Sequence, residues 1–181
     1  LLINRLMYYV NEVGYINVVK TNMPSKQIKF SPFQTSEFKY KNIKTTINSK
    51  QTFGERIFMV GERCGEKVIN WSNAPCFGYG VPKIIMAHKM YGMPFLDISG
   101  EYGISNRDNY VVSDYNTEEL KCLLEYLSLN FIQDVFDTTR YRMRYLEKYA
   151  FKFIPDITNI ADINENDITN KTIEEYFCIN Q

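Results

Sequence analysis

The chain has little glycine, little proline, no net charge and no long apolar run. Its 181 residues include 9 Gly and 6 Pro, and 21 Lys and Arg balance 21 Asp and Glu. Apolar residues make up 45% of the chain, which is too much for a disordered segment, and so little glycine and proline excludes a low-complexity one. No stretch reaches the roughly 18–20 consecutive apolar residues of a membrane helix. We therefore expect a globular domain with no membrane partner.

Cysteine and histidine are also scarce. The four cysteines are scattered with no C-x-x-C pair, and His88 is the only histidine. A zinc site of two cysteines and two histidines is therefore impossible, and an all-cysteine site needs four distant residues to converge. Four buried small apolar side chains in a reducing compartment are the simpler interpretation. We predict no metal site and an intracellular location, in the cytoplasm of a bacterium or of a virus-infected cell.

The first residues carry neither an initiator Met nor a targeting pattern. The segment Leu1-Leu2-Ile3-Asn4-Arg5 lacks the basic, apolar and small-residue order of a signal peptide. A chain of 181 residues can bury most of its surface as one domain without disulfides. We therefore predict a single domain over 1–181 that is a fragment of a longer chain.

The balanced total hides an uneven distribution of charge. Residues 1–152 carry 20 basic against 15 acidic side chains, whereas residues 153–181 carry Lys171 against six acidic ones. The first fifty residues alone have a net charge of +6. A basic body with an acidic end suits a polyanion on one face and a protein neighbour near the tail. An ordinary solvated surface also fits this imbalance, and charge alone does not separate the two.

Short apolar runs predict a sheet in the first two-thirds of the chain. Strands are expected at 56–60, 67–71, 82–87, 102–105 and 109–112, while 21–52 has the composition of loops and short strands. The run at 82–87 delivers His88 and Lys89 at its end, and Asp97-Ile98-Ser99-Gly100 has the composition of a turn.

Helices are expected after residue 116. Asn116 can cap a helix, with Glu119 in the position of a capping box, and apolar residues then recur at helical spacing as far as Val135. Further helices are predicted at about 139–150, ended by Pro155, and at about 172–178. The predicted class is α+β, with a mixed or antiparallel sheet followed by two to three packed C-terminal helices.

Motifs of catalysis and nucleotide binding are missing. There is no G-x-G-x-x-G, Walker loop, G-x-S-x-G or H-E-x-x-H, and Phe77-Gly78-Tyr79-Gly80 is better explained as a turn. We therefore expect no catalytic residue in this segment. An enzyme built on His88, Tyr91, Asp97 and Arg107 is a distant third hypothesis, which a close cluster of the four would support.

A basic and aromatic segment lies at 138–149. It contains Arg140, Arg142, Arg144 and Lys148 between tyrosines. Guanidinium groups pair with phosphates or guanine edges, and tyrosines can stack on bases, so the segment suits a nucleic-acid contact. The open alternative is an amphipathic helix with its tyrosines in the core and its arginines on the surface or paired with acids.

Polar turns at strand ends form the second candidate region. One contains His88, Lys89 and Tyr91, and the other contains Ser105, Asn106, Arg107 and Asn109. Asparagine and arginine can read base edges by paired hydrogen bonds, and such residues commonly sit on loops. Asparagine is equally common in ordinary turns, so both interpretations stay open.

The order of these pieces resembles a known family. The chain reads P-K-I-I-M at 82–86, D-x-x-G-x-Y-G-I-S at 97–105, Y-V-V at 110–112 and E-E-L-K-x-L-L-E-Y-L-S at 118–128. A basic and aromatic segment follows, then I-P-D-I at 154–157 and I-E-E-Y-F at 173–177. This resembles the target-recognition region of type II adenine-specific DNA methyltransferases and fused restriction–modification enzymes. The resemblance covers 81–177 and none of residues 1–80.

The resemblance implies that the chain reads duplex DNA so that a methyltransferase catalytic domain can flip out and methylate an adenine. S-adenosylmethionine would serve that catalytic domain, since the family's Asn-Pro-Pro-Tyr motif and cofactor loop are absent here. The alternative is a protein-interaction module of a multi-subunit assembly, with the aromatic helix expected at about 139–150 as its docking face, because 15% aromatic residues also suit an interface.

Overall fold

The computed structural model describes residues 2–48, 55–60, 63–88, 93–140 and 145–179. It begins with a helix, α1 (Leu2–Val13), and continues through nine strands: β1 (Val19–Lys20), β2 (Phe30–Ser31), β3 (Tyr40–Asn48), β4 (Glu55–Val60), β5 (Arg63–Ser72), β6 (Lys83–Ala87), β7 (Pro94–Asp97), β8 (Gly103–Ile104) and β9 (Asn109–Val112). The helices α2 (Thr117–Leu127), α3 (Asn130–Thr139) and α4 (Asn170–Tyr176) follow, with short 3-10 helices η1 (Lys148–Phe153) and η2 (Ile157–Asn159) between α3 and α4.

The strands form two sheets. The inner sheet has the order β1-β9-β6-β7 and is antiparallel throughout. The outer sheet has the order β2-β5-β3-β8, with β4 also paired to β5. Its pairing is antiparallel except between β3 and β8, which run parallel with Asn42 opposite Gly103 and Ile43 opposite Ile104. The predicted α+β class with a mixed or antiparallel sheet is therefore confirmed.

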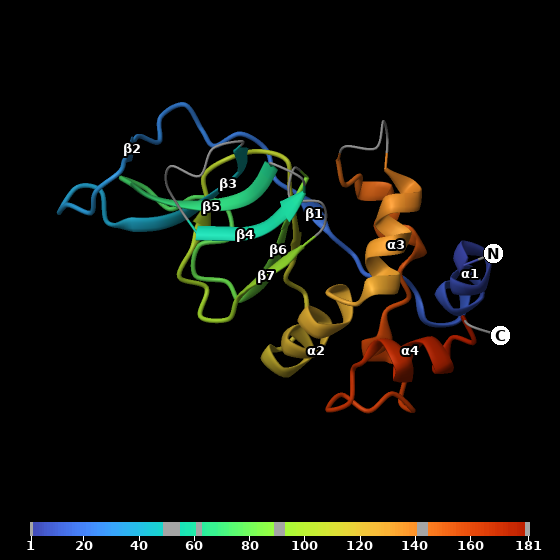
Figure 1. Ribbon diagram of the computed structural model, residues 1–181. Helices are drawn as coiled ribbons and strands as arrows, with labels where there is room; N and C mark the ends of the chain where they lie inside the picture. The colour runs from blue at the N-terminus through green and yellow to red at the C-terminus, as the bar shows by residue number, and fades with distance from the viewer. Residues whose placement is uncertain (1, 49–54, 61–62, 89–92, 141–144, 180–181) are drawn as a thin grey trace.

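The inner sheet lies between the outer sheet and the helices (Figure 1). Successive side chains of a strand point to opposite faces, and β6 shows the consequence. Ile84 and Met86 join the large core formed with the helices, while Ile85 joins a smaller core with Ile43 and Ile104 of the outer sheet. Strand β9 divides in the same way, which makes the molecule a three-layer arrangement.

Several strands appear where the sequence predicts them, and others do not. Strands β4, β6, β8 and β9 match the expected runs, and the run at 67–71 lies inside the longer β5. The expectation of loops and short strands over 21–52 is wrong for β3, whose nine residues all pair with β5. Polar residues separate the two isoleucines of β3 and leave no apolar run, so pairing with β5 rather than local pattern defines this strand. The sequence patterns predict neither helix α1 nor strand β7.

The helix expected from 117 to 135 is interrupted. Asn116 and Glu119 form the predicted capping box at the start of α2, but α2 ends at Leu127 and α3 begins at Asn130. Leu129 is buried in an extended conformation, and the backbone N–H of Asn130 donates to Oδ1 of Asn170 at 2.8 Å. A contact forty residues away therefore stabilises the break, which apolar spacing could not reveal.

The helix expected at about 139–150 is also wrong in the described residues. Helix α3 ends at Thr139, residues 141–144 lie outside the described residues, and the chain is extended at Glu147 before η1. The Leu146 N–H donates to the carbonyl of His88 at 3.0 Å. The Leu146 carbonyl accepts from the Tyr110 hydroxyl at 2.9 Å. These bonds to the ends of β6 and β9 replace the helical ones, because a backbone group paired with a sheet cannot also pair within a helix.

A buried ion pair fixes the turn that leads into β8. Lys83 Nζ lies 2.5 Å from Asp97 Oδ2, with both side chains almost wholly buried, and it also donates to the carbonyls of Gly78 and Tyr102. Burial lowers the pKa of Lys83, and the Asp97 carboxylate opposes that change. Gly100 sits in this turn at φ +71°, where an added Cβ would lie 2.6 Å from the Val81 nitrogen. The buried Lys83 and Asp97 side chains and the close packing at Gly100 therefore fix the backbone path of residues 97–103.

Candidate nucleic-acid interface

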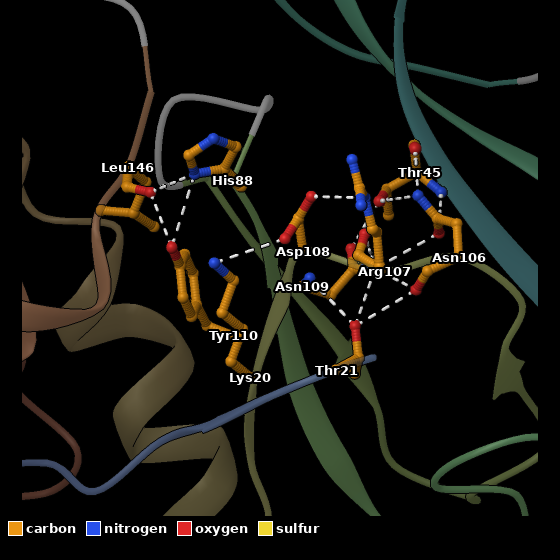
Figure 2. Close-up of polar contacts among 10 residues, drawn as sticks. All are labelled: Lys20, Thr21, Thr45, His88, Asn106, Arg107, Asp108, Asn109, Tyr110 and Leu146. Carbon is orange, nitrogen blue, oxygen red and sulfur yellow. Dashed lines mark hydrogen bonds and ion pairs between the residues drawn. The ribbon is translucent and has the colours of Figure 1, made fainter. Parts of the chain in front are cut away.

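The turn between β8 and β9 is anchored to β3 by one side chain. Asn106 Nδ2 donates to the Thr45 carbonyl at 2.8 Å, and Asn106 Oδ1 accepts from the Thr45 N–H at 3.1 Å (Figure 2). The amide thus bonds both backbone groups of Thr45, as a neighbouring strand would. This contact lies two residues beyond the last parallel pair of β3 and β8, Ile43 with Ile104.

A second asparagine closes the turn from the other side. Asn109 is fully buried, and its amide nitrogen donates to the Asn106 carbonyl at 3.0 Å while its amide oxygen accepts from the Thr45 hydroxyl. Thr21, just after β1, adds backbone bonds to this turn through the Asn109 carbonyl and the Asp108 N–H. Asp108 has φ +65°, a conformation that Asp tolerates better than most residues. Segments from three parts of the chain therefore hold this turn in place.

Arg107 projects from the fixed turn. Its side chain is 68% exposed, and its Nε lies 3.2 Å from Asp108 Oδ2. Lys20 approaches Asp108 Oδ1 at 3.3 Å, as Figure 2 shows. A hollow of about 290 Å³ opens beside Arg107 and is lined by Met23, Lys44, Thr45, Ser105, Asn106 and Asp108. Three cations and one carboxylate therefore meet at this surface.

The structure places the turn residues named from the sequence in different environments. Ser105 is buried and bonds the Asn70 amide and the Ile43 carbonyl. The amides of Asn106 and Asn109 are occupied by internal contacts, so in this conformation they hold the turn and Arg107 is the side chain that faces solvent. Base reading at this turn stays a prediction, and its geometry favours Arg107. No local pattern indicated Lys20, Thr21, Lys44 or Thr45, because they reach the turn from β1, from the residue after it and from β3.

His88 contributes to internal structure. Its Nδ1 lies 2.6 Å from the Leu146 carbonyl, and its ring stacks on Tyr145 with centroids 4.6 Å apart. The ring joins the end of β6 to the segment before η1. Lys89 and Tyr91, predicted as its partners in a DNA contact, lie outside the described residues. His88, Asp97 and Arg107 do not form one cluster, because Asp97 bonds Lys83 and Arg107 bonds Asp108.

The basic and aromatic segment is divided by the fold. Arg140 is the residue after α3, its side chain is only 5% exposed, and its Nε lies 2.6 Å from Asp137 Oδ1. Lys148 is exposed on η1, where it lines a hollow of about 330 Å³ together with Lys152, Tyr149 and residues 15–18. Arg142 and Arg144 lie outside the described residues. Of the described basic residues predicted in this segment, Lys148 is therefore exposed and Arg140 is buried.

The part of the chain that the structure describes shows no metal cluster and no membrane helix. No three His, Cys, Asp or Glu side chains there are grouped to hold a metal ion. No helix in the described ranges has the length and apolarity to cross a membrane. The Phe77-Gly78-Tyr79-Gly80 segment forms a turn, as predicted, and the Gly78 carbonyl accepts from Lys83 at 2.9 Å.

Charge follows the layers of the fold. We call residues 19–112, which contain the strands of both sheets, the sheet half, and residues 1–18 with 113–181 the helical half. The sheet half carries 13 Lys and Arg against 7 Asp and Glu, a net +6, whereas the helical half carries 8 against 14, a net −6. Arg107, Lys20 and Lys44 belong to the basic half.

Comparisons with known proteins found no match among protein-family models, curated proteins or solved structures. The resemblance to DNA target-recognition regions therefore stays a prediction from the sequence.

Proposed function

We propose that this chain binds double-stranded DNA and reads its sequence through Arg107. The observation that carries the proposal is an exposed arginine on a turn whose backbone is fixed by Asn106, Asn109 and Thr45. A guanidinium can bond O6 and N7 of guanine together, and it discriminates best when its backbone cannot shift. Lys20 and Lys44 flank Arg107 and are suited to bind phosphates, which set orientation and affinity.

The separation of charge supports the same assignment. A net charge of +6 on the sheet half favours binding of duplex DNA there, whereas the net −6 of the helical half makes that half less attractive to DNA overall. Lys148 and Lys152 are basic positions of the helical half that remain exposed, and they give a further phosphate contact.

In this proposal the reaction belongs to a methyltransferase catalytic domain, in the same chain or in a partner protein within the cell. That domain uses S-adenosylmethionine to methylate an adenine that has been turned out of the duplex. The present chain contributes DNA binding and sequence preference. The catalytic residues are assigned to the other domain, because this chain contains no Asn-Pro-Pro-Tyr motif.

A salt titration with labelled duplexes tests the proposal. If Lys20 and Lys44 each neutralise one phosphate, affinity falls by at least about 12-fold between ~50 and ~200 mM salt. The Lys44→Ala variant makes the slope of log affinity against log salt shallower by about 1. The Arg107→Ala variant reduces the preference for a selected sequence over random duplex by about 5- to 150-fold.

Lys171→Ala is the matched control, because Lys171 is an exposed lysine of the acidic half. It leaves both affinity and sequence preference unchanged. Affinity that stays flat with salt, or a sequence preference that Arg107→Ala does not reduce, contradicts the proposal.

The alternative of a protein-interaction module assigned docking to an aromatic helix at 139–150. The described part of that segment is an extended stretch followed by η1, with Tyr145 stacked on His88 and the Tyr149 hydroxyl donating to the Thr139 carbonyl. Size-exclusion chromatography with and without duplex DNA separates the two functions, because a DNA-binding domain shifts in elution volume when the duplex is added.

A further inference from the structure

A polar arm joins β1 to β3 and projects from the outer sheet (Figure 1). We define the arm as residues 22–39. It carries Lys26, Lys29 and Lys39 against the single acidic residue Glu37, and all three lysines are exposed. Phe33 is 74% exposed, more than any other large apolar side chain that the structure describes. Exposed aromatic surface and positive charge therefore occur together on one segment.

The base of the arm is tied to the outer sheet. Strand β2 pairs with β5, with Phe30 opposite Ser72 and Ser31 opposite Trp71. The Lys29 N–H donates to Asn73 Oδ1 at 3.0 Å, and the Lys29 carbonyl accepts from the Asn73 N–H at 3.3 Å. These bonds fix residues 29–31 of the arm to the end of β5 and to the residue that follows it.

The tip of the arm holds Phe33 outward. Ser31 Oγ accepts from the Phe33 N–H at 3.1 Å and donates to the Phe33 carbonyl at 2.9 Å, and Pro32 between them fixes its own φ. A few residues on, the Thr35 N–H donates to the Phe38 carbonyl at 3.1 Å and Thr35 Oγ1 accepts from the Phe38 N–H at 2.9 Å. Phe33 is thus presented by an ordered turn, so little conformational entropy is lost when a ligand covers it.

The charges around Phe33 favour a nucleic acid over a protein as its ligand. The centres of protein interfaces are depleted in lysine, whereas nucleic-acid surfaces combine phosphates with stacked aromatic bases. Apolar side chains such as Phe unstack a base step when neighbouring cations hold the backbone. The composition of the arm and the exposure of Phe33 match that requirement.

The arm also begins at the surface assigned to sequence reading. Met23, its second residue, lines the hollow that Lys44 and Arg107 share. From these contacts we infer that the arm is a second DNA-binding element, in which Phe33 inserts as a wedge at a base step near the sequence read by Arg107. Lys26, Lys29 and Lys39 bind the phosphates on either side. This inference rests on the proposed DNA-binding function.

Fluorescence of 2-aminopurine tests the wedge. The probe is a set of duplexes of the sequence selected by the wild-type chain, each with one 2-aminopurine at a successive position. Unstacking raises the fluorescence of this base, so wild type raises it at one step. Phe33→Ala abolishes the rise and weakens binding by about 5- to 150-fold, the range for loss of one stacked aromatic. Phe33→Leu, which keeps an apolar wedge, retains most of the rise.

Tyr8→Ala is the matched control, because Tyr8 is a 65% exposed aromatic on α1 in the helical half. It keeps the wild-type rise. The inference is overturned if wild type saturates every duplex without a rise in 2-aminopurine fluorescence at any position. It is also overturned if Phe33→Ala raises the fluorescence as much as wild type does. In either case an intact, Arg107-dependent sequence preference leaves the proposed function standing. If wild type shows no salt-dependent duplex binding, both proposals fail.

Discussion

The two halves of the molecule are stabilised in different ways. In the sheet half, internal polar contacts are prominent: the Lys83–Asp97 ion pair and the amides of Asn42, Asn106 and Asn109 are buried or partly buried among backbone groups. In the helical half the core is mainly apolar, with side chains such as Leu123, Phe131, Ile132, Phe136 and Phe177. Polar contacts have strict geometry, so they fix the position of a turn more closely than apolar packing does. The half that presents Arg107 is the one organised by them.

The first prediction breaks the buried ion pair of the sheet half. Asp97→Ala removes the acceptor of Lys83 Nζ and of the Glu101 and Tyr102 N–H groups. Leaving a buried ammonium without its partner costs about 3–5 kcal/mol of unfolding free energy. Urea denaturation measures this loss.

Two further variants control for charge alone. Glu118→Ala breaks the exposed pair with Lys121 and costs less than about 0.5 kcal/mol. The double variant Lys83→Met with Asp97→Leu recovers part of the stability lost in Asp97→Ala, since it leaves no buried charge. If Asp97→Ala is as mild as Glu118→Ala, the ion pair does not stabilise the sheet half.

The second prediction concerns alkaline pH and the helical half. Burial raises the pKa of the Cys122 thiol on α2 from 9.0 to about 11. The folded state therefore disfavours the thiolate, which the unfolded chain forms above about pH 9. The contribution of the neutral thiol to the free energy of unfolding is complete below about pH 9 and is lost as pH rises toward 11. A shift of two units corresponds to about 2–3 kcal/mol.

Urea denaturation at a series of pH values measures this loss. As pH rises from 9 to 11, the unfolding free energy of wild type falls relative to that of Cys122→Ala. A constant difference over that range would show that Cys122 does not titrate between the folded and unfolded states as proposed.

The third and smallest effect is expected at the start of α2. Asn116→Ala removes the capping box in which Asn116 Oδ1 accepts from the Glu119 N–H at 2.9 Å. Loss of such a cap costs about 1 kcal/mol, and thermal unfolding measures it. Asn22→Ala, at an exposed position of the arm, is the control for asparagine replacement. Because α2 belongs to the helical half, affinity for duplex DNA is unchanged, and a loss of affinity in Asn116→Ala would contradict this division of roles.

Local patterns predicted the elements whose sequence signal is local. The apolar run of β6 and the capping box of α2 could be predicted because each signal lies within one segment. The break before α3 and the non-helical path at Leu146 could not, since they depend on Asn170 and His88, 40 and 58 residues away. The candidate site follows the same rule: Arg107 was identified from its own turn, whereas the contact between Asn106 and Thr45 spans 61 residues.

The alternation of side chains along β6 and β9 has a consequence for how the molecule unfolds. Each of these strands contributes side chains to both cores. Loss of the helices would therefore expose the apolar face of the inner sheet that they cover, while its other face stays covered by the outer sheet. Neither the outer sheet nor the helical layer can unfold first without exposing the inner sheet to water. The three layers are therefore coupled into a single cooperative transition, and calorimetry should record one heat-absorption peak rather than two.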